Sequence, residues 1–242
     1  MRTSGWRPSG WHIAVLIPAR DEEHLLPRCL RSVQAARARL PEDVTSDIVV
    51  VSDCSRDRTT EIAEELLEET GAVFCTDAGL VGMVRSAAAG FALERYKGPR
   101  ERCWLANTDA DCEVPEAWLL DQLAIAGRGF SAVAGTVAVD SFAEHDPEVE
   151  ELFRLTYRIN SDGTHPHVHG ANLGVRADAY LRAGGWMDLA TAEDHDLWNR
   201  LRRTGDSRLS DASLRVLTSG RRMGRAPLGF ADALAAHNGI AT

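Results

Sequence analysis

The chain has 242 residues, of which 44% are hydrophobic and 26% charged, and its formal net charge is −9. These values are typical of a soluble globular protein that is long enough to bury a sizeable core. The acidic balance argues against a protein that coats nucleic acid, because phosphate binding needs a basic face. It leaves room for a nucleotide ligand, which needs only a local site.

The cysteine and hydropathy patterns bear on the compartment. Five cysteines without a CxxC pair predict reduced thiols in a reducing compartment, not a disulfide framework or a zinc knuckle. No apolar run approaches the roughly 18 residues that cross a bilayer, and residues 1–10 are not followed by a signal-peptide core. We therefore expect a cytoplasmic protein with no transmembrane segment, and leave peripheral membrane contact and a homodimer open.

Buried strands and helices are expected to alternate through the first half of the chain. The apolar runs at 12–17, 47–52, 72–75 and 103–106 are typical of strands, and the stretches 22–39, 59–70 and 84–96 of helices. This alternation predicts an α/β fold with a mainly parallel sheet and helices on both faces. Ligands of such sheets bind beyond the carboxyl ends of the strands, which points to loops 18–23, 53–58 and 107–114.

The second half is less regular. It predicts a strand at 131–139, helices starting near Pro115 and at 147–160, 192–203 and 230–237, and a polar loop at 161–170. The chain has no internal repeat, low-complexity tract or linker. We therefore expect one domain over 1–242, with a nucleotide-binding half at about 12–114 and an acceptor-binding half at about 115–238.

Asp109 and Asp111 follow a predicted buried strand in the segment Asn-Thr-Asp-Ala-Asp-Cys. Buried carboxylates are costly unless something neutralises them. Mg²⁺ or Mn²⁺ bound by one or both carboxylates would do so and would also hold a diphosphate. The alternative is a turn in which an Asp caps the helix that starts near Pro115.

Two further acidic sites have both a functional and a structural interpretation. Asp53 follows the strand at 47–52, where it would accept hydrogen bonds from a base or ribose, or cap the helix at Thr59. Glu193, Asp194 and Asp196 come at the start of a predicted helix, where acids are favoured by the dipole. Asp194 could equally act as a general base toward an acceptor hydroxyl.

Two basic segments also have alternatives. Arg221, Arg222 and Arg225 would clamp phosphates or lie in a solvated loop. The histidines at 165, 167 and 169 alternate and would share one face of an extended chain. They favour a polar acceptor loop over a metal cluster.

Several of these segments together resemble the family 2 glycosyltransferases, an inverting group with the GT-A fold, from Ile13 to about Phe230. The segment from Leu16, Leu-Ile-Pro-Ala-Arg-Asp-Glu-Glu, is similar to the opening IPxxNEE signature, with Asp21 in place of Asn. The segment from Val50 resembles VVDDGSxDxT, with Ser52 and Cys54 replacing Asp and Gly.

Later segments extend the resemblance. Residues 82–90, with Arg85, are similar to the donor-binding segment after the third strand, and Asp-Ala-Asp at 109–111 is similar to the D-x-D motif. Gly-Ala-Asn-Leu-Gly-Val-Arg from Gly170 and Ala-Gly-Gly-Trp from Ala183 resemble the acceptor segment GANxxxRR…GGF. Glu193 and Asp194 correspond to the family's ED pair, in which the Asp is the base.

The resemblance implies a role for each matching residue. The nucleotide sugar would contact Pro18, Ala19, Arg20, Glu22, Asp53, Arg85, Asp109, Arg221 and Arg222. The acceptor would contact Gly170, Ala171, Asn172, Trp186 and Glu193. The metal would bind Asp111, with Asp109 at the ribose or the metal, and Asp194 would be catalytic.

The resemblance implies a metal-dependent hexosyltransferase that uses a nucleoside-diphosphate sugar, with uridine as the first choice of nucleoside and guanosine the second. Inversion would follow from direct displacement by a hydroxyl of a carbohydrate, a lipid-linked group or a small molecule. One alternative is a sugar nucleotidyltransferase, although the loop after the first strand lacks the glycines expected for it. Another is a homologue that binds nucleotide sugars without turnover.

Overall fold

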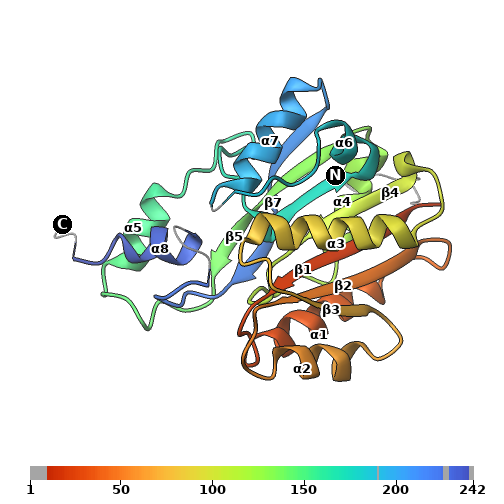
Figure 1. Ribbon diagram of the computed structural model, residues 1–242. Helices are drawn as coiled ribbons and strands as arrows, with labels where there is room; N and C mark the ends of the chain where they lie inside the picture. Colours follow the sequence, from red (N-terminus) through yellow and green to blue (C-terminus); the bar gives the residue numbers. More distant parts are fainter. Residues whose placement is uncertain (1–9, 190, 226–228, 240–242) are drawn as a thin grey trace.

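The computed structural model describes residues 10–189, 191–225 and 229–239, and a seven-stranded sheet lies at its centre (Figure 1). The strand order is β3-β2-β1-β4-β6-β5-β7. The strands are β1 His12–Ala19, β2 Thr45–Asp53, β3 Ala72–Thr76, β4 Cys103–Asn107, β5 Ala132–Val139, β6 Leu173–Arg176 and β7 Arg208–Thr218. Strand β6 is antiparallel to both of its neighbours, and the other neighbouring pairs are parallel.

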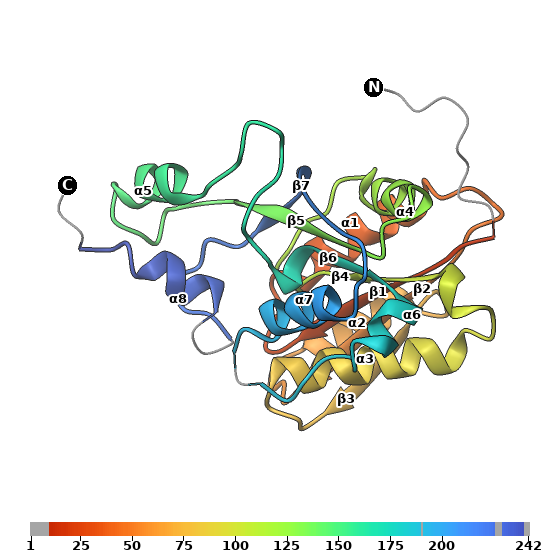
Figure 2. The ribbon, with the colours of Figure 1, turned by 90° about the horizontal axis from the view of Figure 1, so that it is seen from above.

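Helices cover both faces of this sheet (Figure 2). The helices are α1 Leu26–Arg37, α2 Thr59–Leu67, α3 Val81–Arg95, α4 Trp118–Gly127, α5 Val149–Thr156, α6 Ala177–Arg182, α7 Glu193–Arg203 and α8 Phe230–Ala235. Short 3₁₀ turns occupy Arg100–Arg102 and Gly170–Asn172. The expected α/β class with a mainly parallel sheet is confirmed.

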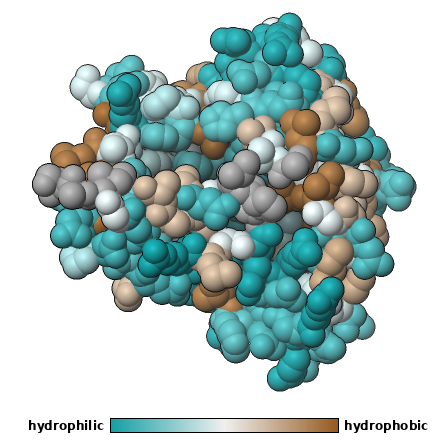
Figure 3. All heavy atoms as spheres, turned by 60° about the vertical axis from the view of Figure 1, so that its left-hand side comes forward, coloured by the Kyte–Doolittle hydropathy of each residue, from teal (hydrophilic) through white to brown (hydrophobic). Residues whose placement is uncertain are grey.

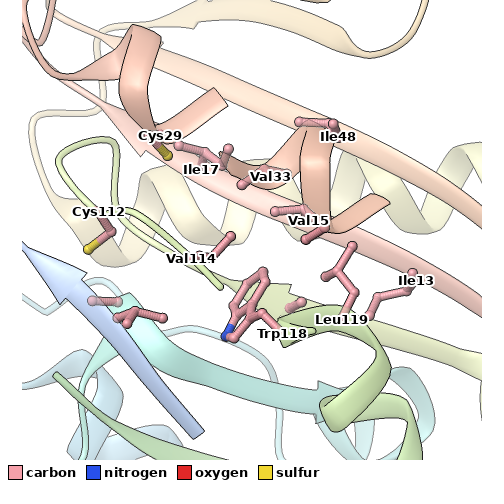
Figure 4. Packing of buried hydrophobic residues seen from close by; sticks show 14 of the residues in the cluster. Ile13, Val15, Ile17, Cys29, Val33, Ile48, Cys112, Val114, Trp118 and Leu119 are labelled. Atoms are coloured by element: carbon pink, nitrogen blue, oxygen red, sulfur yellow. The ribbon is translucent and has the colours of Figure 1, made fainter. Parts of the chain in front are cut away.

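Strand β1 is buried on both faces, because its side chains alternate between the two faces of the sheet and helices pack against each face. Ile13, Val15 and Ile17 belong to a core with α1, α2 and α4, part of which is shown in Figure 4. Ala14 and Leu16 belong to a second core with α3, α6 and α7. This double burial explains why the strand is a continuous apolar run.

Strands β1, β2 and β4 end at the same edge of the sheet, where the loops singled out above follow them. Ala19 pairs with Ser52, and Leu16 pairs with Asn107. The 3₁₀ turn before β6 opens at this edge as well, since Asn107 pairs with Leu173. Residues from both expected halves of the chain therefore meet at one end of one sheet.

The structure adds elements that the expectation for the second half omitted. Strand β6 has four residues and helix α6 six, which is too short for a periodic pattern to show. Strand β7 was also missed, although Ala212, Leu214 and Val216 are buried between exposed neighbours, which is the period of a half-buried strand. Helices α5 and α8 pack beside each other, with the rings of Phe153 and Phe230 6.0 Å apart.

Candidate active site

A cavity of about 430 Å³ opens at the carboxyl edge of the sheet. Residues from β1 to α3 and from the loop after β4 line one part. Residues from the 3₁₀ turn Gly170–Asn172, α7, β7 and α8 line the other. Among the described residues, its charged lining comprises six carboxylates and four guanidinium groups, namely Glu22, Asp53, Asp109, Asp111, Glu193, Asp194, Arg20, Arg85, Arg221 and Arg225. The cavity is therefore rich in carboxylates, with arginines interspersed among them.

The loops after β1 and β2 hold each other through reciprocal hydrogen bonds. The backbone N–H of Glu22 donates to Thr59 Oγ1 at 2.7 Å, and that of Glu23 donates to Asp57 at 3.0 Å. In return, Asp21 accepts from the N–H of Arg56 at 2.7 Å. Asp57, not Asp53, therefore supports the start of α2. The hydrogen bonds between the two loops fix Glu22 at the cavity.

Asp53 braces the loop after β3. Its Oδ1 accepts from Thr76 Oγ1 at 2.9 Å and from the N–H groups of Ala78 at 2.8 Å and Gly79 at 3.2 Å. Its Oδ2 also accepts from the N–H of Gly79, at 3.2 Å. The residue is buried and lines the cavity, so its carboxylate borders a ligand-sized space. Capping of α2 at Thr59, the structural alternative for Asp53, is not observed.

Each aspartate of the D-x-D segment has an arginine partner. Arg85 Nη2 lies 2.5 Å from Asp109 Oδ1. Arg221 Nη2 lies 3.0 Å from Asp111 Oδ2 and 2.6 Å from Glu22 Oε1, so this guanidinium bridges two carboxylates. Burial raises the pKa of Asp111 to about 7; Arg221 opposes the shift, whereas Asp109 and Glu22 add to it.

The residues around Asp111 fit a divalent cation. Carboxylate oxygens are the ligands that Mg²⁺ and Mn²⁺ favour. The pKa of Asp111 is raised first by burial and then by Asp109 and Glu22, so its charge is costly there even with Arg221 beside it. A diphosphate would add further negative charge to a lining that already has more carboxylates than guanidinium groups. Within the described residues, no ready-made cluster of three or more His, Cys, Asp or Glu side chains is found, so the phosphates and water would complete the coordination.

Arg85 connects the D-x-D segment to helix α7. Its side chain is almost fully buried, with Nε 3.5 Å from Glu193 Oε1 and the guanidinium 5.4 Å from the ring centre of Trp186. A Cβ on Gly170 would come within 2.4 Å of Arg85 Nη2, so a glycine at 170 makes room for this arginine. Two sides of the cavity thus share one buried cation.

Helix α7 begins at the cavity, and two of the three acidic residues of its first turn, Glu193 and Asp194, line it. Ala192, just before it, has φ 58°, a left-handed conformation that is costly for a residue with a Cβ. Asp194 Oδ2 accepts from the N–H of Gly170 at 2.9 Å. Asp196 points elsewhere and pairs with Arg200 at 2.8 Å.

Most of the expected site residues line this cavity, but three do not. Those that line it are Pro18, Ala19, Arg20, Glu22, Asp53, Arg85, Asp109, Asp111, Gly170, Ala171, Glu193, Asp194 and Arg221. Asn172 is fully buried and bonds to Trp118, Thr136 and Leu214, so it holds strands together and does not face an acceptor. Trp186 packs in the core under Arg85, and Arg222 is exposed and binds Glu144 through its N–H.

The alternating histidines form a stack of rings that reaches the cavity. Ring centres of His165 and His167, and of His167 and His169, are 5.9 Å apart, and Tyr157 stacks on His167 at 3.9 Å. Parallel rings at this spacing do not converge on one metal ion, and the described residues contain no group of three or more His, Cys, Asp or Glu side chains that could hold one. Of the three histidines, His169 lines the cavity.

Sequence reasoning also missed some cavity residues. Gly79, Leu80, Thr191 and Phe230 contribute to the lining, and they belong to the loop after β3, the approach to α7 and the start of α8. The loop after β3 had a signal, because it follows a parallel strand like the three loops that were chosen. Nothing in the local sequence marks the other two segments.

The model of the family described as glycosyl transferase family 2 matches residues 14–182, which is more than half of the chain. The chain belongs to this family. The match covers β1 through α6, including the D-x-D segment and Gly170. It stops before Glu193, Asp194 and the arginines after β7.

One curated relative of this family 2 chain is the undecaprenyl-phosphate 4-deoxy-4-formamido-L-arabinose transferase of Pseudomonas fluorescens (strain Pf0-1). The two are 32% identical over 132 residues, which cover 54% of this chain and 37% of the relative. The chain thus spans little more than a third of that protein's length.

Solved structures with similar folds confirm the expected GT-A architecture. The mannosyltransferase PcManGT from Pyrobaculum calidifontis, in complex with GDP-Man and Mn²⁺, has a TM-score of 0.65 at 17% identity over 92% of this chain and 62% of that one. S. aureus TarS has a TM-score of 0.63 at 16% identity over 86% of this chain and 36% of TarS. A TarS fragment, residues 1–349, was solved with UDP and has a TM-score of 0.60 at 17% identity over 87% of this chain and 61% of the fragment.

The remaining surface offers few further clues to partners. No helix in the described part of the chain is long and apolar enough to span a membrane. Among described residues the large exposed apolar side chains include Leu155, Ile159 and Met223. The face in Figure 3 is mainly hydrophilic, with apolar groups in separate patches.

Proposed function

We propose that this chain transfers a sugar from a nucleoside-diphosphate sugar to a hydroxyl group of an acceptor. The observation that carries the proposal is the placement of Asp109, Asp111 and Asp194 on one cavity, with Arg85 between the D-x-D segment and helix α7. A donor diphosphate at Asp109 and Asp111 would bring its sugar toward Asp194. UDP is our first choice of nucleotide and GDP the second.

Asp194 is the proposed general base. Its Oδ2 accepts one hydrogen bond from Gly170, which fixes the carboxylate at the cavity wall. A carboxylate held in this way takes the proton from the acceptor hydroxyl as its oxygen attacks the anomeric carbon. Attack from the face opposite the diphosphate inverts that carbon in one displacement, and no covalent sugar–enzyme intermediate forms.

The reaction also requires that the negative charge developing on the leaving diphosphate be stabilised. When bound at Asp111, Mg²⁺ or Mn²⁺ would supply a positive charge at the diphosphate oxygens. Arg221 and Arg225 lie at Glu22 and would turn their guanidinium groups to the phosphates once the donor is present. Cations placed at the developing charge stabilise the transition state and lower the barrier.

The acceptor is proposed only by class. The curated relative is named as an undecaprenyl-phosphate transferase, which makes a lipid-linked acceptor worth testing beside free carbohydrates and small molecules. Glu193 and the peptide groups of Gly170 and Ala171 border the space beside Asp194 and would position that acceptor.

A nucleotidyltransferase is a weaker candidate, because the loop after β1 is clasped to the loop after β2 through side chains and contains no glycine. A silent homologue is also less favoured, since the Asp194 carboxylate lines the cavity together with Asp109 and Asp111.

A panel of UDP- and GDP-sugars tests the proposal, with and without Mn²⁺, by thermal shift and by release of nucleoside diphosphate. We expect stabilisation by at least one nucleotide that increases with Mn²⁺. Nucleoside diphosphate release that depends on an added hydroxyl acceptor would support transfer. Nucleotide-monophosphate transfer to a sugar phosphate would support the nucleotidyltransferase instead. Binding without any turnover would support the silent homologue.

A further inference from the structure

His169 lines the cavity beside the proposed base, Asp194. It directly precedes Gly170, whose N–H holds Asp194. Phe230 lines the same part of the cavity, and its ring contacts that of His169 edge-on at 5.8 Å. The carbonyl of His169 accepts from the N–H of Asn172 at 2.9 Å, so the backbone here is fixed from both sides.

Tyr157 determines which nitrogen of His169 carries the proton. Tyr157 Oη accepts from the N–H of Val137 at 3.0 Å and lies 2.9 Å from His169 Nε2. Burial raises the pKa of Tyr157 to about 12, so the phenol keeps its proton. Tyr157 is half-buried and its oxygen already accepts from Val137, so we expect its proton to go to Nε2, the acceptor within its reach among the described residues. Nε2 is then unprotonated, and the proton of the ring lies on Nδ1.

The His169 ring is neutral near pH 7. Burial, assisted by His167, His165 and His195, lowers its pKa to about 3. Its Nδ1 has no hydrogen-bond partner in the part of the chain that the structure describes, while Nε2 is held by Tyr157. His169 therefore offers the cavity a single neutral donor of fixed direction.

A neutral donor suits one kind of ligand atom better than another. Phosphate oxygens favour the guanidinium groups of Arg221 and Arg225, which lie at Glu22 on the donor side. Hydroxyl and ether oxygens carry no charge to be neutralised, so an uncharged N–H satisfies them at no cost in net charge. The aromatic edge of Phe230 beside it adds an apolar wall of the kind that sugar C–H groups contact.

We propose that His169 is an acceptor-binding residue whose Nδ1–H donates to a neutral oxygen of a sugar or polyol group of the acceptor, with Tyr157 as the residue that fixes its tautomer. This inference rests on the proposed function for the identity of the substrate. The tautomer itself is a property of the free protein and does not.

The first experiment therefore uses the free protein. Long-range ¹H–¹⁵N spectra of the ¹⁵N-labelled chain between about pH 5 and about pH 8 report the protonation of each histidine. We expect His169 to stay neutral with its proton on Nδ1, and Tyr157→Phe to produce a mixture of tautomers. A proton on Nε2, or a charged ring near pH 6, would overturn the proposal whether or not the chain transfers sugar.

The second experiment separates the acceptor from the donor. His169→Phe keeps the ring stack and removes the donor, and His167→Phe is its matched control because His167 stacks in the same column but does not line the cavity. We expect His169→Phe to raise KM for the acceptor about 2- to 12-fold, the value of one neutral hydrogen bond, with Kd for Mn²⁺–UDP or Mn²⁺–GDP unchanged. His167→Phe should alter neither quantity.

A loss of nucleotide affinity in His169→Phe as large as the rise in acceptor KM would place His169 at the donor and contradict the proposal. Equal effects in both variants would indicate a purely structural stack and also contradict it. If the wild-type chain transfers to no acceptor, the proposed function fails, and the tautomer measurement still decides whether His169 is the fixed Nδ1–H donor.

Discussion

Arg85 and Asp109, which both line the cavity, form an ion pair at 2.5 Å, and the same guanidinium lies 3.5 Å from Glu193. The arginine is nearly inaccessible, so burial opposes its charge, while Asp109 and Glu193 support it and raise its pKa. A single buried cation thus joins the D-x-D segment to the first turn of α7. This contact holds the proposed donor-binding and acceptor-binding residues in a fixed relation.

Arg85→Gln should therefore reduce both stability and transfer. Glu193 is buried and would lose the guanidinium beside it, and removing one partner of a buried pair costs roughly 3 kcal/mol or more. Chemical denaturation measures this loss. Arg154→Gln is the matched control, because Arg154 pairs with Glu151 on the exposed surface and should cost about 1 kcal/mol or less. Similar losses in both variants would show that Arg85 does not hold the site together.

Metal binding gives a prediction in which two variants move in opposite directions. Asp111→Asn removes an anionic ligand and should weaken binding of Mn²⁺ alone, whereas Arg221→Gln removes a resident cation 3.0 Å from Asp111 and should strengthen it. Arg221→Gln should at the same time weaken binding of the nucleoside diphosphate, since it removes a phosphate donor. Calorimetric titrations with Mn²⁺, and then with UDP or GDP in its presence, check both. Unchanged Mn²⁺ affinity in Asp111→Asn would refute the assignment of the metal to this residue.

Asp53 should affect nucleotide affinity beyond its role in the loop after β3. Asp53→Ala removes the loop contacts together with the carboxylate at the cavity, whereas Thr76→Val removes one loop contact and leaves that carboxylate in place. We expect Thr76→Val to lower the melting temperature without changing nucleotide affinity. Asp53→Ala should in addition lose roughly 1.5 to 3 kcal/mol of binding free energy, the value of a hydrogen bond to a charged group. Equal nucleotide affinity in the two variants would leave Asp53 as a structural residue only.

The first half of this fold was predictable because each strand is an apolar run that ends in a polar loop. Strand β1 is buried on both faces, and no side chain interrupts its pattern between Ile13 and Ile17. The position of Asp53 and Asp109 after parallel strands then followed from topology. The positions of such residues follow from the local sequence together with the rule that ligands bind beyond the carboxyl ends of parallel strands.

The second half was harder to predict because its site residues depend on distant partners. Asn172 lies within a segment that resembles the family's sugar-acceptor motif. Whether its amide faces a ligand or bonds to Thr136 and Leu214 depends on how β5 and β7 pack. Trp186 likewise packs its ring against the Arg85 guanidinium and does not line the cavity. Such contacts arise from long-range packing, which neither periodicity nor motif spacing encodes.

The stability of the chain should depend on pH through His169. Its pKa falls from 6.5 to about 3 on folding, so between these values the unfolded chain binds a proton that the folded chain does not. This residue therefore reduces the free energy of unfolding as pH falls through that window, and it has no such effect above it. His169→Phe should show a smaller loss of stability between about pH 7 and about pH 4 than the wild-type chain, measured by denaturant titration. Parallel pH profiles for the two proteins would contradict burial of a neutral His169.

Asp194 carries the central claim, and its neighbours in α7 provide matched controls. Glu193 is buried against Arg85, and Asp196 pairs with Arg200 away from the cavity. The amide replacement removes the proposed base at Asp194, a proposed positioning residue at Glu193 and an ion pair away from the cavity at Asp196. If all three acids only stabilise the helix start, each should cost a similar small amount of stability, roughly 0.3 to 1 kcal/mol.

The measurement is the rate of sugar transfer for Asp194→Asn, with Glu193→Gln and Asp196→Asn beside it, at saturating donor and Mn²⁺. A general base contributes about 10² to 10⁴-fold, so Asp194→Asn should bind the donor almost normally, remain folded and lose transfer by about that factor. Glu193→Gln should lose less and Asp196→Asn least. Full transfer by Asp194→Asn would contradict the proposed mechanism.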